Sequence, residues 1–548
     1  MCGIAGGNNP NWNYLQGIES ICHRGPDGKR VETCNDMTLA FCRLAIQDLS
    51  IHAMQPMNSP DGRVHIVYNG EIYGYQGLKE KLKQKYQFHT TSDTEVILYA
   101  YMEYGERFID EIDGIFAMAI YDERIHKVYL YRDRAGVKPL YYYYENGRFA
   151  FASELKALVQ MLDDVFLKID RTAVYDYLLY QYVPEPKSMY EQINKLEPAA
   201  MLIFDTLEKR ITAESKYWKL SVNTSVGRKR KREDIADELR YLIRQTVEEQ
   251  MISDVPVGTF LSGGVDSSII TYEVSRLKPE VDAFSIGFRE TQFDESERAK
   301  IFCEKKHISL VQKMVRSKDV KQIKNNLPKW YDEPFGDTSA YPTYLVSALA
   351  RNKCTVVLTG DGGDELFGGY DRYKTAAAYG EALKKEDVYG LYGGLVPTVE
   401  DFRIKWSIPD DYNPYWHYEK YYSEDMPIVT RMRYLDFMTY LHEAVLTKVD
   451  RASMAVSLEA RVPLLARRIV EFAFSLSQEE YLSENELKGC LKDAYRGIVP
   501  DEILYGVKMG FGVPDNYLWR ERHEQNINAG ILRIQWGELD DALSGNRI

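Results

Sequence analysis

The sequence lacks the features that mark secreted, membrane-spanning and zinc-finger proteins. It has seven scattered cysteines, an odd number with no CxxC pair, which indicates a reducing compartment and argues against a structural zinc site. No apolar run is long enough to cross a membrane. The first residues, MCGIAGGNNPNWN, have neither the basic segment nor the apolar core of a signal peptide. We therefore expect a cytoplasmic protein.

Excess positive charge is also missing. The formal net charge is −13, which argues against general nucleic-acid binding. The chain contains no Gly-Lys-Ser/Thr run, so a Walker A phosphate loop is excluded. The apolar content of 45% and the charged content of 28% are ordinary for a globular enzyme, and 548 residues predict two or more domains.

The stretch FLSGGVDSS, residues 260–268, does predict a phosphate site. An apolar run over Val255–Leu261 favours a buried strand, and Ile270, Val274 and Leu277 then recur at helical spacing. A strand, a tight glycine turn and a helix start aim backbone N–H groups and the helix dipole at one point, which suits a phosphate. The alternative is an ordinary strand–turn–helix with a serine N-cap.

A second loop carries acidic residues. The apolar run Val356–Leu358 is followed by TGDGGDE, which places carboxylates at the carboxyl end of a strand, where open α/β sheets bind ligands. Asp266, Asp361, Asp364 and Glu365 are candidate magnesium ligands, because hard cations favour oxygen. A turn rich in Asp and Gly is also a common loop signature.

At the other end of the chain, Cys2 follows the initiator Met1. If Met1 is removed, Cys2 carries a thiol and an α-amine whose ordinary pKa is about 7.7–8.0. Such an amine can accept the thiol proton near neutral pH, which would make Cys2 an N-terminal nucleophile. A cysteine at position 2 is otherwise an accident of sequence.

Several further segments accompany Cys2 in order: MCGIAG, HRGPDG (23–28), CRLAIQDL (42–49), YNGEIY (68–73) and SDTE (92–95). Together with SGGVDSS, they make the chain resemble the glutamine-hydrolysing asparagine synthetase family from Cys2 to about Phe511. The resemblance implies an α/β protein of two domains. Residues 2–218 would form an αββα N-terminal-nucleophile hydrolase sandwich, a class II glutamine amidotransferase. Residues 230–548 would form a parallel-sheet ATP-pyrophosphatase domain, adenine nucleotide α-hydrolase-like, with a helical C-terminal part.

The resemblance also implies roles for individual residues. Cys2 would be the nucleophile, Asn69 and Gly70 the oxyanion donors, Asp361 an acid beside the acceptor, and Lys508 the cation at the phosphates. Arg43, Glu71 and Asp93 would bind glutamine. The implied ATP-binding residues are Leu261, Ser262, Gly263, Gly264, Val265, Asp266, Ser267, Ser268, Ile286, Thr359 and Gly360. Asp266 and Asp364 would hold Mg²⁺. Arg461 belongs to a family-like segment, and its role stays open.

Some of these residues have simpler interpretations. Asn69-Gly70 between two β-type runs is a hairpin signal, Ser92–Glu95 is a capping box, and Arg43 could be a surface charge. The basic run of residues 228–232 precedes an amphipathic helix, and we interpret it as a solvated linker that enters this helix. The domain boundary is expected within residues 219–234.

By resemblance, glutamine gives ammonia at Cys2, ATP activates L-aspartate as an acyl-AMP with release of pyrophosphate, and ammonia carried inside the protein yields asparagine. The expected cofactors are ATP and Mg²⁺, and the partners are small-molecule substrates, with no nucleic acid or membrane; a homodimer is left open. The chain departs from the family at Ala466, where relatives usually have Asp, and at Asp361, where some have Glu. The shorter acid at 361 keeps another acceptor open, such as a cell-wall, sugar or secondary-metabolite carboxylate. A non-catalytic regulator is disfavoured by the intact Cys2, Asn69, SGGVDSS and Lys508 set. The related β-lactam synthetases have lost the nucleophilic cysteine, so the presence of Cys2 disfavours that branch.

Overall fold

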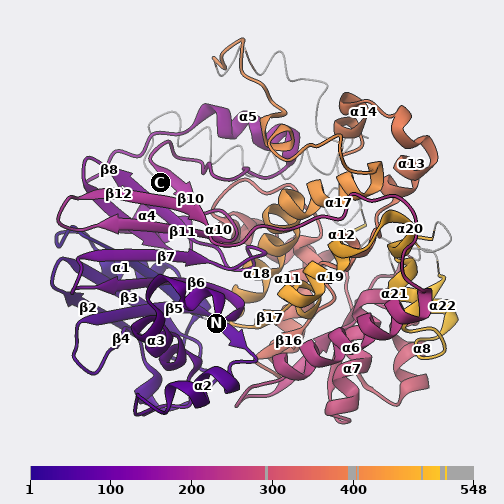
Figure 1. Ribbon diagram of the computed structural model, residues 1–548, viewed down its shortest axis with the longest axis horizontal. Helices are drawn as coiled ribbons and strands as arrows, with labels where there is room; N and C mark the ends of the chain where they lie inside the picture. Colours follow the sequence, from indigo (N-terminus) through magenta and orange to yellow (C-terminus); the bar gives the residue numbers. More distant parts are fainter. Residues whose placement is uncertain are drawn as a thin grey trace.

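The computed structural model describes residues 2–290, 294–392, 403, 407–482, 486–506 and 512–514. Two domains lie side by side (Figure 1): a β-rich N-terminal domain and a domain of helices around a parallel sheet. The predicted two-domain α/β fold class is confirmed.

Two stacked sheets of six strands each form the N-terminal domain. The first has the order β10-β8-β9-β1-β3-β2 and the second β12-β11-β7-β6-β5-β4, and every neighbouring pair is antiparallel where its register is defined. The strands of the first sheet are β1 (Gly3–Gly7), β2 (Gly28–Cys34), β3 (Met37–Arg43), β8 (Tyr141–Glu145), β9 (Arg148–Ala152) and β10 (Ile193–Lys195). Those of the second are β4 (Met57–Asn58), β5 (Val64–Tyr73), β6 (Asp113–Asp122), β7 (Lys127–Arg132), β11 (Ala200–Asp205) and β12 (Arg210–Lys216).

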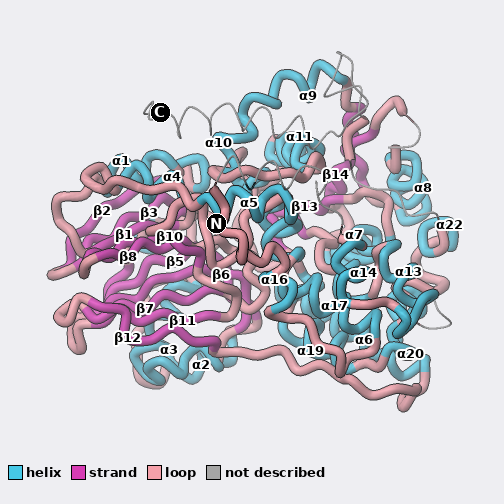
Figure 2. The backbone as a smooth tube through the Cα atoms, turned by 90° about the horizontal axis from the view of Figure 1, so that it is seen from above, coloured by secondary structure: helices cyan, strands magenta, loops and turns pink. Residues whose placement is uncertain are grey.

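Helices cover both outer faces of this sandwich, so the layers run αββα, as Figure 2 shows from above. Helices α1 (Tyr14–Ser20) and α4 (Leu155–Met161) pack on the first sheet, and α2 (Gln76–Leu82) and α3 (Asp93–Tyr104) pack on the second. Alternate strand residues such as Ile4, Phe41 and Val67 fill the core between the sheets, because successive side chains of a strand point to opposite faces.

The hairpin interpretation of Asn69-Gly70 is wrong. Both residues lie inside β5, where Asn69 pairs with Ala117 and Gly70 with Phe116 of β6. A Cβ on Gly70 would lie 2.2 Å from the Ile115 carbonyl oxygen, so the glycine is required by close approach of the neighbouring strand rather than by a turn. The capping-box interpretation is half right. Ser92 caps α3 by accepting from the Thr94 N–H, but Glu95 accepts from the backbone of His89 and Thr90 instead.

The second domain is built on a parallel sheet of five strands, in the order β15-β14-β13-β16-β17. Its strands are β13 (Val257–Phe260), β14 (Asp282–Gly287), β15 (Ser309–Met314), β16 (Val356–Leu358) and β17 (Glu459–Arg461). The chain builds outward from β13 through β14 to β15 and then places β16 on the other side of β13. The carboxyl ends of β13 and β16 therefore form the topological switch point, where open α/β sheets bind ligands.

Helices bury both faces of this sheet. Helices α6 (Arg232–Gln250), α7 (Val265–Leu277) and α8 (Ser296–Lys306) contribute to one core, which includes Val356 and Leu358. Helices α11 (Ala340–Arg351) and α18 (Thr447–Met454) contribute to another, which includes Val357. Further helices of the chain are α5 (Arg171–Tyr180), α9 (Ser317–Ile323), α10 (Leu327–Tyr331), α12 (Gly363–Phe367), α13 (Asp371–Tyr379), α14 (Lys385–Gly390), α16 (Trp416–Glu419), α17 (Ile428–Met438), α19 (Arg467–Ser475), α20 (Gln478–Tyr481), α21 (Gly489–Ala494) and α22 (Asp501–Leu504).

The basic run before α6 is a linker, as predicted, but it is not simply solvated. Arg228 donates to the Glu479 carbonyl oxygen at 3.0 Å, the Arg230 guanidinium lies over the Phe472 ring, and Arg232 pairs with Asp493. These contacts fasten the linker to the C-terminal helices.

Buried ion pairs join the two domains. The Arg24 guanidinium contacts Glu154 at 2.7 Å within its own domain and Asp450 of α18 at 2.8 Å. The departure at Ala466 is also compensated across the interface. Ala466 occupies the N-cap of α19 without a side-chain hydrogen bond, and the Arg467 N–H donates instead to Asp113 Oδ2 at 3.3 Å. A carboxylate thus caps this helix, although it comes from the other domain.

Candidate functional site

The loops after β13 and β16 meet at the switch point and line a cavity of about 1010 Å³. Gly360 of the second loop lies against the start of α7, where a Cβ would come within 2.6 Å of the Ser267 nitrogen. The two predicted motifs are therefore brought together. Nine of the predicted residues of the ATP set line the cavity: Leu261, Ser262, Gly264, Val265, Asp266, Ser267, Ile286, Thr359 and Gly360.

The first loop is held open by its own hydroxyl groups. The Ser262 hydroxyl accepts from the Gly264 N–H at 3.2 Å and lies 3.1 Å from Ser267 Oγ. Gly264, not a serine, is the N-cap of α7, so the serine N-cap alternative is wrong. The turn leaves the first N–H groups of a 13-residue helix at the cavity, which is the geometry that binds anions.

Two residues of the predicted ATP set do not line the cavity. Gly263, at φ +92°, turns toward α8, where a Cβ would lie 2.8 Å from the Glu295 carbonyl oxygen. Ser268 is fully buried in α7. Their position supports the shape of the loop rather than contact with a ligand.

Lys488 is the cavity residue that the sequence did not reveal. Its ammonium group pairs with Asp266 and lies 2.7 Å from Asp364 Oδ1. Burial opposes the charge of Lys488, but the two carboxylates dominate and raise its pKa. Asp266 and Asp364, the two predicted metal ligands, therefore converge on one cation position from separate loops.

Asp361 lines the same cavity on the side of Lys448. Burial raises the pKa of the Asp361 carboxyl, and the positive charge of Lys448 opposes this rise. Lys448 itself lies 3.2 Å from Asp337 Oδ2. This part of the cavity offers carboxylates and a half-buried ammonium group. Lys508 lies outside the described residues.

Cys2 is buried and directly precedes β1. Its N–H donates to Asn69 Oδ1 at 3.0 Å, and its carbonyl oxygen accepts from Arg24 Nε at 3.1 Å. Asn69 is fully buried, and its Nδ2 group has no hydrogen-bond partner among the described residues. A buried amide donor without a partner is costly unless a ligand completes it. Burial raises the pKa of the Cys2 thiol, so a nearby base is needed to form the thiolate.

The three predicted glutamine-binding residues surround this end of β5. Arg43 is only 7% exposed and donates to the backbone carbonyl oxygens of Ser50 and Asp48, so its interpretation as a surface charge is wrong. Asp93 Oδ2 accepts from the Tyr68 hydroxyl at 2.9 Å and from the Ile72 N–H at 3.0 Å. Burial raises the pKa of Asp93 to about 6. Glu71 accepts a hydrogen bond from the Gln47 side-chain amide. Burial, and then the negative charge of Asp93, raises the pKa of Glu71.

Arg461 connects the two sites, and this answers the question that the sequence left open. Its carbonyl oxygen accepts from the Thr359 N–H at 2.9 Å, at the start of the acidic loop. Its guanidinium pairs with Glu459 at 2.6 Å and lies 3.7 Å from Glu71 Oε1. One fully buried residue thus contacts both Glu71 of β5 and the loop that follows β16.

None of the helices that the structure describes combines the length and apolar character that a membrane crossing needs.

Comparisons with known proteins match both halves of the chain. A glutamine amidotransferase domain family matches residues 1–218, and the asparagine synthase family matches residues 238–533. Asparagine synthetase (glutamine-hydrolysing) 1 of Bacillus subtilis is 33% identical over 536 residues, which cover 90% of this chain and 83% of that protein. Asparagine synthetase (glutamine-hydrolysing) 3 of the same organism is 29% identical and covers 93% and 86%. A protein of Gibberella zeae named amidase chry2 is 25% identical and covers 96% and 90%.

Proposed function

The chain belongs to the family of glutamine-hydrolysing asparagine synthetases, and on this premise we propose that it converts L-aspartate to asparagine. It is an ATP-dependent carbon–nitrogen ligase with glutamine as the amido donor. Residues 2–218 would hydrolyse glutamine, and residues 230–548 would form the acyl-AMP and release AMP and pyrophosphate. One observation carries the proposal: the same chain holds the Cys2–Asn69 contact in one domain and the switch-point cavity in the other, and buried ion pairs join the two domains.

At the glutamine site, we propose that Cys2 attacks the amide after removal of Met1, with its own α-amine as the base. The unpartnered Asn69 Nδ2 and the Gly70 N–H would stabilise the oxyanion. Arg43 would bind the substrate carboxylate and Asp93 the substrate ammonium, with Glu71 assisting. The buried position of all three is consistent with these roles.

At the nucleotide site, the loop of residues 261–268 would bind the phosphates together with Thr359 and Gly360, while Ile286 would contact the adenine. Asp266 and Asp364 would hold Mg²⁺, because their carboxylates already converge on the ammonium of Lys488. The bound ion would neutralise phosphate charge. Asp361 would contact the acceptor, and Lys508 would stabilise the phosphates in the transition state.

Cytoplasmic location is proposed on the seven free cysteines, which suit a reducing compartment. A homodimer stays a prediction, which light scattering on the purified protein would check.

The acceptor is tested by pyrophosphate release with ammonium, ATP and one carboxylic acid at a time. L-aspartate is expected to give asparagine and stoichiometric pyrophosphate at an ordinary enzymatic rate. Asp361 is one methylene shorter than Glu, and a shift of ~1 Å at a reacting centre can cost about 10²-fold, so larger carboxylates belong in the same screen. Failure with aspartate, in protein that hydrolyses glutamine, would favour the alternative acceptor.

We predict that Asn69→Ala slows glutamine hydrolysis about 10²–10³-fold, the usual effect of one oxyanion donor. Asn69→Asp keeps an acceptor for the Cys2 N–H and loses the donor, but it also adds a buried negative charge that repels the oxyanion, so it should slow glutaminase kcat at least as much as Asn69→Ala. Both variants should leave ammonium-dependent synthesis unchanged. If the aspartate variant keeps the parent rate, Asn69 merely holds the Cys2 backbone.

We predict that kcat/KM for glutamine falls below pH 6. The pKa of Asp93 is raised to about 6, so its carboxylate is ionised above this pH. Below it, the carboxyl protonates and no longer binds the substrate ammonium, and kcat/KM should fall by nearly tenfold per pH unit. Tyr68→Phe removes a hydrogen bond that favours the ionised form, so it should move this limb to higher pH. Tyr99→Phe is the control, because the Tyr99 hydroxyl interacts with the Gln87 carbonyl oxygen and with Glu95 instead of Asp93. An unmoved limb in Tyr68→Phe would assign the titration to another group.

A further inference from the structure

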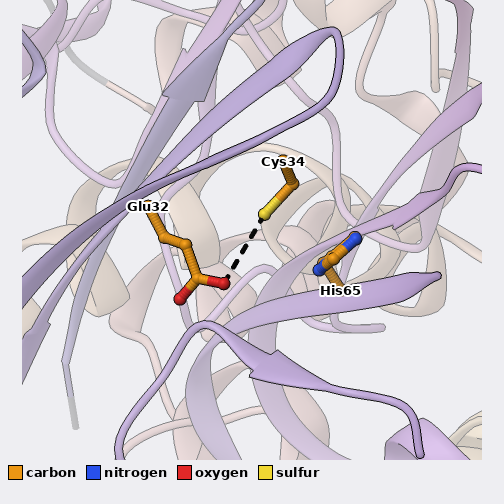
Figure 3. A group of neighbouring side chains, drawn as sticks. All are labelled: Glu32, Cys34 and His65. Atoms are coloured by element: carbon orange, nitrogen blue, oxygen red, sulfur yellow. Dashed lines mark hydrogen bonds between the residues drawn. The ribbon is translucent and has the colours of Figure 1, made fainter. Parts of the chain in front are cut away.

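A cluster of metal-ligating side chains lies at the edge of the N-terminal sandwich, and neither site above uses it. Glu32 and Cys34 come from the end of β2 and His65 from the start of β5 (Figure 3). One ligand atom of each lies within 4.8 Å of the others. Cys34 and His65 are buried, and Glu32 is half-buried. Because β2 and β5 belong to different sheets, the cluster bridges the two layers.

A further carboxylate, Glu123, lies beside this group of three without being part of it. Its Oε1 atom lies 3.0 Å from His65 Nε2. Glu32 Oε1 lies 3.8 Å from the Cys34 sulfur, and burial, followed by the charges of Glu32 and Glu123, raises the pKa of the Cys34 thiol to about 12. Among the described residues, neither carboxylate forms an ion pair with a lysine or arginine.

The other Glu/His cluster of the described chain makes a useful contrast. Glu185, His442 and Glu443 are equally close to one another, but Arg132 pairs with Glu185 and Lys195 lies 3.4 Å from Glu443 Oε2. Arg132 and Lys195 therefore neutralise that cluster. In the described part of the chain, no lysine or arginine pairs with Glu32 or Glu123 at the sandwich edge.

Hydrogen bonds fix the His65 ring in the orientation of a metal ligand. Asn58 donates from Nδ2 to Glu32 Oε1 at 3.0 Å, which turns its Oδ1 toward His65 Nδ1 at 2.9 Å. Nδ1 must therefore carry the proton, since Oδ1 can only accept. The other ring nitrogen, Nε2, lies 3.0 Å from Glu123 Oε1. An amide oxygen that fixes the other ring nitrogen is the usual support for a histidine ligand.

We propose that Cys34, His65 and Glu32 bind one divalent transition-metal ion of the zinc class, with the fourth position left to Glu123 or water. Thiolate, imidazole and carboxylate are the ligands that Zn²⁺ takes, in a tetrahedral set of four. The site joins the two sheets at one edge of the sandwich. His65 precedes Asn69 by four residues on β5, roughly 13 Å at about 3.3 Å per residue, so the ion stabilises the sandwich and takes no part in glutamine chemistry. Cysteine spacing could not indicate this site, because it contains one cysteine and its histidine comes from a different strand.

The test is titration of the chelator-treated full-length protein with Co²⁺, which substitutes for Zn²⁺ and reports a thiolate ligand by a charge-transfer band. We expect one equivalent to bind with this band, and Zn²⁺ to displace it. Cys34→Ser should lose the band and His65→Gln should weaken Co²⁺ binding at least tenfold. Cys22→Ser, which removes a partly exposed thiol outside the cluster, should match the parent protein.

Two results would overturn the proposal: no thiolate band in the folded parent protein, or a band that persists in Cys34→Ser. Should the variants fail to fold, X-ray absorption on the parent protein with one equivalent of Zn²⁺ decides. It should give one sulfur at about 2.3 Å and nitrogen or oxygen ligands at about 2.0–2.2 Å; a shell without sulfur contradicts the site. Zn²⁺ should also raise the thermal midpoint of the parent and of Cys22→Ser, but not of Cys34→Ser.

Discussion

Replacing Cys2 with alanine is expected to abolish glutamine-dependent synthesis and to leave ammonium-dependent synthesis intact. The Cys2 backbone N–H donates to Asn69 Oδ1, which places the proposed nucleophile beside the proposed oxyanion donor, and loss of a catalytic nucleophile costs about 10⁴-fold or more. The cavity at the switch point is built by other segments, namely the loops of residues 261–267 and 359–364. The alanine side chain should therefore leave pyrophosphate release with ammonium within about twofold of the parent rate.

Two assays on the same preparation measure this separation: glutamate release from glutamine, and pyrophosphate release with ammonium as the nitrogen source. Cys22→Ala is the matched control, since it removes a thiol from the same domain and keeps the Cys2–Asn69 contact. The alanine variant should still show a normal unfolding midpoint. If both activities disappear in folded Cys2→Ala protein, the two half-reactions do not belong to separate sites.

The sequence predicted the local elements of this enzyme well because their signals are local. The strand predicted over Val356–Leu358 appears with these bounds, and the predicted run Val255–Leu261 contains β13 (Val257–Phe260). Apolar alternation, or a short apolar run between turn residues, suffices to identify such strands. The hairpin prediction for Asn69-Gly70 was wrong because glycine is also required where a neighbouring strand approaches closely. That requirement depends on Ile115 of β6, which is 45 positions away and leaves no mark near Asn69.

Contacts between distant segments could not be read in the same way. Lys488 follows no motif, yet it lies between Asp266 and Asp364 because those carboxylates need a buried cation. Asp113 caps α19 across 354 positions of sequence, so the alanine at 466 looked like a loss when only its neighbours were considered. Likewise, Arg461 was recognised as part of a segment, but its contacts with Thr359 and Glu71 follow from the pairing of β16 with β17.

The nucleotide site gives the second large effect. Asp266→Asn is expected to reduce pyrophosphate release about 10³-fold or more while glutamine hydrolysis is unchanged. Asp266 is the second residue of α7, at the carboxyl end of β13, and its carboxylate faces Asp364 across one cation position. A catalytic metal ion contributes several kcal/mol of charge stabilisation, and a loss of ~4 kcal/mol corresponds to about 10³-fold in rate. The amide keeps the size of the carboxylate, so the close approach of Gly363 to Asp266 is undisturbed.

Asp371→Asn is the matched control, because Asp371 lines the same cavity but pairs only with the exposed Lys374 among the ion pairs of the described residues. It should retain the parent rate. Asp266→Asn should also need more Mg²⁺ for half-maximal activity, whereas a variant that only perturbed the loop would change the KM for ATP and leave the Mg²⁺ requirement unaltered. A rate within tenfold of the parent would assign Asp266 to the ion pair with Lys488 alone. If glutamine hydrolysis falls by the same factor, the substitution perturbs both domains. The result would then give no support to a metal-binding role for Asp266.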